Sequence, residues 1–156
     1  MSGITWLSLI AIITSIAAAA TSILAFIYSR KIDKRELFLR LHHQMTQLDA
    51  QKGRRLLHQA KKRGRMPIDK ERDLINHAMA LLDIVGFYQE KGHIKEREVM
   101  KLWGATFLQL EEAGKWFIKR RTIEENRHGQ DLWPFFKDMC DNAHKHHAAR
   151  QLSRLK

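Results

Sequence analysis

Residues 4–28 read ITWLSLIAIITSIAAAATSILAFIY, a run of 25 residues without a charged side chain. At about 1.5 Å per residue, an α-helix of this length extends roughly 37 Å, which is more than the hydrocarbon core of a bilayer. The run therefore predicts a transmembrane helix, and residues 1–29 are expected to form a membrane anchor. Residues 30–156 are expected to form one domain, because a chain of this length is too short for two ordinary hydrophobic cores.

Small residues recur along one side of this predicted helix with a period of seven. They are Ser8, Ala11, Ser15, Ala18, Ser22, Ala25 and Ser29. A stripe of small residues lets a second membrane helix approach closely, so it predicts a helix–helix interface and a homo-oligomer or membrane-protein complex. Two alternatives remain open: the hydroxyl groups bond to the preceding turn of their own helix, or several copies use them to line a pore.

The charges around the apolar run predict its orientation. No basic side chain precedes the run, whereas four follow it at once: Arg30, Lys31, Lys34 and Arg35. By the positive-inside rule, the C-terminal domain is expected in the cytoplasm and the N-terminus outside the inner membrane. The missing basic residues before the run, and its continuation past Ala17–Ala19, argue against a cleaved signal peptide. The single cysteine, Cys140, agrees with a reducing compartment and is expected to pack as a small apolar side chain.

The rest of the chain has apolar residues at helical spacing and no sustained alternation, which predicts an all-α bundle. Helices are expected over 33–48, 49–62, from 69 to a turn at 92–93, over 95–127, and from 131 onward, with the anchor running directly into the first and a tail that frays after His144. The expected start signals are Asp49, Asp69 and Asp131, and the expected stop signals are Gly64, Gly92 and Gly129. Pro134 fits the first turn of the last helix.

The expected core follows from the same spacing. In chain order it contains Leu37, Phe38, Leu41, Met45, Leu48, Leu56, Leu57, Ala60, Leu74, Ile75, Ala78, Leu81, Leu82, Val85, Val99, Leu102, Trp103, Phe107, Leu110, Phe117, Trp133, Phe135, Phe136, Met139 and Cys140.

A family resemblance lies in the order of three segments after the anchor. They are LINHAMALLDIVGFYQEKGHIKEREVMKLWG at 74–104, WFIKRR at 116–121 and WPFFKDM at 133–139. Over residues 30–142 this order resembles bacterial membrane-anchored proteins grouped as domain of unknown function 4760. The resemblance implies an anchor followed by a helical domain, and it brings no established activity.

Motifs for catalysis are missing from the sequence. It contains no glycine-rich phosphate loop, nucleophile elbow or HExxH motif, so we expect no enzymatic activity and no cofactor. His144 and His147 have the spacing of residues on one helix face, but no cysteine or carboxylate stands at a fixed spacing to complete a metal site. The sequence therefore favours a solvated, partly protonated tail over metal binding.

Positive charge is the informative property of the predicted domain. The formal net charge is +11, and the main cluster comprises Lys52, Arg54, Arg55, Lys61, Lys62, Arg63 and Arg65, with a second cluster at 119–121. Beside a bilayer, such clusters attract anionic lipid headgroups or an acidic partner. Nucleic acid is a weaker hypothesis, because no recognition motif accompanies the charge. We therefore expect a membrane-anchored binding or assembly module, with a small oligomeric pore-forming effector of phage exclusion or cell defence as the alternative.

Overall fold

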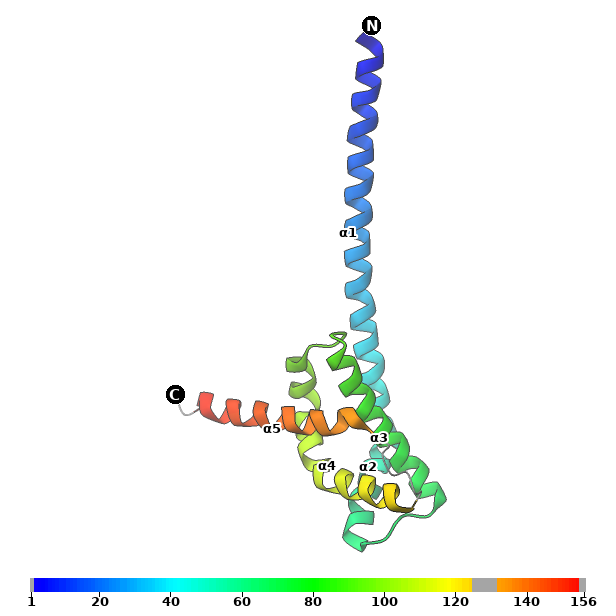
Figure 1. Cartoon of the computed structure of the whole chain (residues 1–156), viewed down its shortest axis with the longest axis vertical. Helices are drawn as coiled ribbons and strands as arrows, with labels where there is room; N and C mark the ends of the chain where they lie inside the picture. The colour runs from blue at the N-terminus through cyan, green and yellow to red at the C-terminus, as the bar shows by residue number, and fades with distance from the viewer. Residues whose placement is uncertain (1, 125–131, 155–156) are drawn as a thin grey trace. The chain divides into compact units, whose positions relative to one another are not determined.

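The computed structural model describes residues 2–124 and 132–154, and within them every regular element is an α-helix (Figure 1). The helices are α1 (Ser2–Thr46), α2 (Leu48–Arg63), α3 (Asp69–Glu90), α4 (Glu96–Glu124) and α5 (Pro134–Arg154). The prediction of an all-α chain, with a long apolar helix followed by a helical bundle, is confirmed. The chain divides into two compact units, Met1–Leu39 and Arg40–Lys156.

Helix α1 is continuous from the apolar run into the basic segment, as the lack of any linker composition predicted. Its last turns supply two core residues, Leu41 and Met45, which are 3% and 2% exposed. The expected contribution of Leu48 is wrong: α1 ends at Thr46, and Leu48 begins α2 with 64% of its surface exposed.

The start signals of α2 and α3 lie one or two residues earlier than predicted. Gln47 and Ile68 hold the N-cap positions, and neither makes a side-chain capping bond. Asp49 and Asp69 instead lie inside the first turn, where a carboxylate interacts favourably with the positive end of the helix dipole. The end of α2 is as predicted, because Gly64 takes a left-handed conformation, φ +66°, after Arg63.

Helix α5 differs from the sequence prediction in length. It remains helical to Arg154, so the expected fraying after His144 is wrong, although the residues from His147 to Ser153 are exposed. The start at Pro134 is consistent with its predicted place in the first turn. The expected roles of Gly129 and Asp131, and the predicted end of the preceding helix at Arg127, lie outside the described residues.

A tertiary contact fixes the beginning of α5. The backbone N–H of Phe136 donates to Oδ1 of Asp83 on α3, 3.0 Å away, so a side chain from another helix satisfies an amide of the first turn. Trp133, just before α5, has a left-handed backbone, φ +55°, and its ring stacks on Phe117 of α4 with 6.0 Å between ring centres. Contacts between residues that are far apart in the sequence therefore determine where this helix starts.

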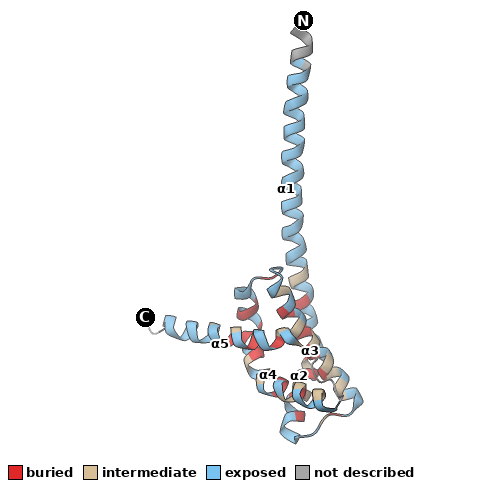
Figure 2. Cartoon of the chain, in the orientation of Figure 1, coloured by how far each residue is buried: buried red, intermediate tan, exposed pale blue. Residues whose placement is uncertain are grey.

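The core lies among α2, α3, α4 and α5 and the end of α1, as the buried positions in Figure 2 show. The largest of its fully buried side chains are Phe107, Phe117 and Phe136. Cys140 is also fully buried, as predicted, whereas Leu102 is 47% exposed and its predicted core position is wrong.

Glycines at the helix contacts allow the helices to pack this closely, and Gly53 and Gly114 are two of them. A Cβ at Gly53 would lie 2.8 Å from the Ala78 Cβ and from the Leu74 carbonyl carbon on α3, and closer still to the Leu74 carbonyl oxygen. A Cβ at Gly114 would lie 2.6 Å from the ring of Phe136. Both positions lack room for a methyl group, so any larger residue must move a helix or a buried ring.

Candidate functional site

Helix α1 exposes its apolar side chains around its whole circumference. It is the one helix in the described residues that is long and apolar enough to cross a bilayer, and none of its most apolar window is buried (Figure 2). Examples on different sides are Phe26 at 59%, Ile16 at 64% and Leu24 at 65% exposed. A water-exposed apolar surface of this extent is typical of a segment that another apolar phase covers.

The predicted helix–helix interface lies on this exposed helix, and the hydroxyls of its two central serines are already engaged. Ser15 donates to the Ala11 carbonyl and Ser22 donates to the Ala18 carbonyl, each at 2.8 Å. Thr14 and Thr21 bond the preceding turn in the same way. Because these protons are used within one helix, close packing of two helices here depends on the small size of the side chains.

The four cations after the apolar run are all exposed on α1. Arg30 lies over the ring of Phe26, with 4.7 Å between the guanidinium carbon and the ring centre. A cation held beside the last aromatic residues of an apolar segment is the arrangement found where membrane helices leave the bilayer.

Four of the predicted cations share the exposed side of α2. At about 100° per residue, Lys52, Arg55, Lys62 and Arg63 fall within an arc of roughly 100°. The buried residues of the same helix, among them Gly53 and Leu57, lie on the opposite side. Together with the exposed Arg65 that follows the helix, these four residues form a surface that we call the α2 basic face.

The two other predicted cations of this cluster are engaged within the domain. The Nη2 group of Arg54 donates to the Met45 carbonyl at 3.0 Å, and the guanidinium is half-buried. Burial lowers the pKa of Arg54. Lys61 pairs with Glu112 of α4 at 3.2 Å, a contact between partly exposed side chains that contributes little to stability.

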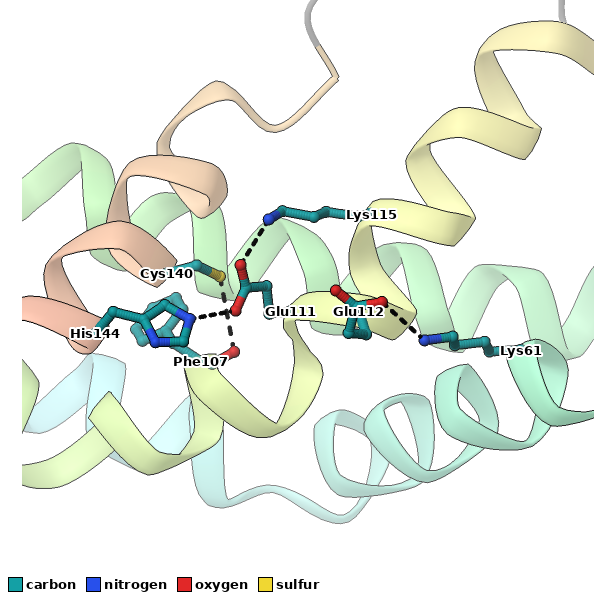
Figure 3. Close-up of polar contacts among 7 residues, drawn as sticks. All are labelled: Lys61, Phe107, Glu111, Glu112, Lys115, Cys140 and His144. Carbon is teal, nitrogen blue, oxygen red and sulfur yellow. Dashed lines mark hydrogen bonds and ion pairs between the residues drawn. The ribbon is translucent and has the colours of Figure 1, made fainter. Parts of the chain in front are cut away.

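A second polar cluster joins α4 to α5, and the sequence did not predict it (Figure 3). Oε1 of Glu111 accepts from Lys115 and Oε2 contacts His144, both at 2.6 Å. The hydrogen bond from Lys115, followed by that from His144, lowers the pKa of Glu111.

Cys140 lies next to this cluster and is buried. Burial raises the pKa of its thiol to about 12, and its Sγ lies 3.7 Å from the Phe107 carbonyl oxygen. The thiol is therefore protonated and unreactive at neutral pH.

The histidines of the tail are not gathered with other potential metal ligands in the part of the chain that the structure describes. His144 is engaged with Glu111, and no three His, Cys, Asp or Glu side chains are grouped there as metal ligands would be.

The second basic cluster is also divided: Lys119 and Arg120 are exposed, whereas Arg121 bonds Asn76 at 2.8 Å and lies over Trp133.

No family model, no curated protein and no solved structure matches this chain. The resemblance to domain of unknown function 4760 therefore stays a prediction. So does the expectation that the chain is not an enzyme.

Proposed function

We propose that this chain is a single-pass membrane protein whose helical domain binds anionic lipid at the cytoplasmic face of the inner membrane. The observation that carries the proposal is the exposed apolar surface of α1, which ends in a group of cations. A helix with this surface is unfavourable in water and favourable in the hydrocarbon core. The cations that directly follow the apolar run support the orientation with the domain inside.

Lipid binding by the domain is supported by the α2 basic face. Each cation close to an anionic leaflet contributes about 1 kcal/mol, and the attraction fades over roughly 8 to 10 Å at moderate salt. The anchor holds the domain close to the bilayer, so individually weak contacts act at a high effective concentration.

Self-association through the serine–alanine stripe is the second part of the proposal. The large side chains on the other side of α1, such as Ile16, Ile23 and Ile27, keep backbones apart, whereas the stripe lets them approach. The internal hydroxyl bonds satisfy the polar groups in lipid, so the helix inserts as a monomer and pairs afterwards.

A matched pair of triple variants tests the pairing. Replacing Ser15, Ala18 and Ser22 by Leu is expected to separate the helices and reduce the signal of a membrane two-hybrid assay. The control replaces Ile16, Ile23 and Ile27 by Leu, which keeps the segment equally apolar and is expected to leave the signal unchanged. Equal signals from both variants would refute the pairing. Loss of an ion conductance with pairing intact would favour the pore-forming effector.

Energy transfer between the domain and the bilayer tests the lipid contact. A donor dye is attached at Gln59→Cys, in the centre of the α2 basic face, on the full chain in nanodiscs that carry a lipid acceptor. Transfer is expected to rise when neutral lipid is replaced by anionic lipid and to fall again at high salt. Changing Lys52, Lys62 and Arg63 to Gln is expected to remove this response.

The matched control removes the same amount of charge from other helices. Changing Lys101, Lys137 and Lys145 on α4 and α5 to Gln is expected to preserve the response to anionic lipid. If both triple variants lose it equally, net charge rather than the α2 basic face is responsible. Equal energy transfer in neutral and in anionic discs would contradict binding to anionic lipid. A reporter at Lys156 that is active only outside the cell would contradict the orientation.

A further inference from the structure

A groove between α2 and α4 is lined almost entirely by hydrogen-bonding side chains. Its volume is about 310 Å³, and the residues around it are Gln51, Arg54, Arg55, His58, Thr106, Gln109 and Leu110. The lining residues carry two guanidinium groups, two amides, a hydroxyl and an imidazole, and no carboxylate is among them. The amide of Gln51 already donates to the Thr46 carbonyl at 2.8 Å. The groove therefore offers hydrogen-bond donors and positive charge to an acceptor that the domain itself does not provide.

Arg54 is the residue that makes this groove unusual. Its Nη2 group bonds the Met45 carbonyl, but its Nη1 group is buried without a hydrogen-bond partner among the described residues. A buried donor without an acceptor is destabilising, and more so when it belongs to a charged group. Because Arg54 also lines the groove, an anion that enters the groove lies next to a guanidinium charge that no carboxylate among the lining residues offsets.

We propose that the groove binds one phosphate group. A phosphate carries more negative charge than a carboxylate and offers several acceptor oxygens, so it can serve Arg54 and Arg55 at the same time. The neutral donors Gln109 and Thr106 of α4 face the same space and supply further hydrogen bonds. This site goes beyond the lipid contact proposed above, because it is a discrete groove that shares only Arg55 with the α2 basic face.

Two sources can deliver the phosphate, a free phosphate compound or the headgroup of a phosphomonoester lipid. Both are tested on the full chain in nanodiscs by following the side-chain ¹⁵N signals of arginine. Inorganic phosphate added to neutral discs is expected to shift the signals of Arg54 and Arg55 saturably, whereas chloride at the same ionic strength does not.

The second arm replaces the added phosphate by phosphatidic acid within the discs, compared with phosphatidylglycerol at equal surface charge. Shifts with phosphatidic acid that are absent with phosphatidylglycerol identify a lipid headgroup as the ligand. Shifts with free phosphate alone identify a soluble ligand. The absence of saturable shifts in both arms overturns the proposal.

Variants separate the groove from general charge attraction. Gln109→Glu places a carboxylate on the rim without touching Arg54, at an exposed position that tolerates the isosteric change. It is expected to weaken phosphate binding at least about tenfold, because one charge-assisted contact is exchanged for repulsion. Arg54→Lys keeps the charge, loses the planar donor pair and is expected to weaken binding similarly.

The matched control is Lys62→Gln, on the exposed side of α2 and outside the groove. It is expected to reduce the energy transfer with anionic lipid and to leave the affinity for inorganic phosphate unchanged. If Lys62→Gln weakens phosphate binding as much as Gln109→Glu does, the phosphate is held by diffuse charge and the discrete site is refuted. An unchanged affinity in Gln109→Glu refutes it as well.

Discussion

Replacing Gly53 by alanine is the most stringent test of how the domain is packed. In an ordinary helix interior this change stabilises a protein by about 1 kcal/mol, because alanine is the better helix former. Here the new methyl group would lie 2.8 Å from the Ala78 Cβ and from the Leu74 carbonyl carbon, closer than atoms pack in protein cores. The Leu74 obstacle is backbone, so no side-chain rotation can relieve the contact.

The size of the effect follows from the distance that must be gained. Carbon atoms in contact prefer about 3.5 to 4 Å, so α2 and α3 must separate by roughly 1 Å. Forcing a methylene into a packed core costs about 1 to 3 kcal/mol, and the upper end applies because two backbones move together. After the gain in helix propensity, Gly53→Ala is expected to destabilise the domain by about 2 kcal/mol.

Gly104 provides the control, because it lies in the middle of α4 with room for a methyl group. The nearest atoms to a Cβ there are Met100 Sδ and Cβ, at 3.7 and 3.8 Å. Gly104→Ala is therefore expected to stabilise the domain by up to about 1 kcal/mol. Thermal unfolding of the full chain in mild detergent, followed by tryptophan fluorescence, should place the Tm of Gly53→Ala about 5 to 10 °C below wild type. A Tm at or above wild type would refute the close packing of α2 on α3.

Three further predictions concern the contacts around α5. Asp83→Ala removes the acceptor for the Phe136 amide and is expected to cost about 1 to 2 kcal/mol, with faster hydrogen exchange in the first turn of α5; unchanged exchange there would contradict the cap. Because the pKa of Glu111 is lowered on folding, its stabilisation is present above the unfolded value near pH 4.3 and is lost as the pH falls through the folded value. Denaturant unfolding should therefore show Glu111→Gln less stable than wild type near neutral pH and converging with it as the pH falls below the unfolded value, and a pH-independent difference would be inconsistent with this. Cys140, whose pKa burial raises to about 12, should resist maleimide at about pH 8 until the domain is unfolded, and native labelling would disprove its burial.

The sequence predicted those features that depend on local periodicity. The all-helical secondary structure, the continuous α1 and the left-handed end of α2 at Gly64 all follow from spacing and composition within one segment. Leu48 and Leu102 were misplaced because both fit the apolar spacing, yet a helix end and a solvent-exposed edge remove them from the core.

The candidate site was predictable only in part, because it also depends on contacts between different helices. The sequence shows that cations cluster in residues 52–65, but it does not show which of them bond to groups within the domain. Arg54 and Lys61 find their partners in Met45 and Glu112, on other helices, and the groove depends on α2 lying beside α4. Such pairings are properties of the packed domain, and no spacing rule within one helix reveals them.

The cap from Asp83 to Phe136 has a consequence for the order of folding. The two residues are 53 positions apart, so closing this contact brings together distant parts of an unfolded chain and costs considerable loop entropy. Helices α2 and α3 are neighbours in the sequence, and their contact closes a short loop first. The first turn of α5 should therefore gain its hydrogen bonds late, after α3 is in place, and its amides should become protected last when refolding is followed by pulsed hydrogen exchange.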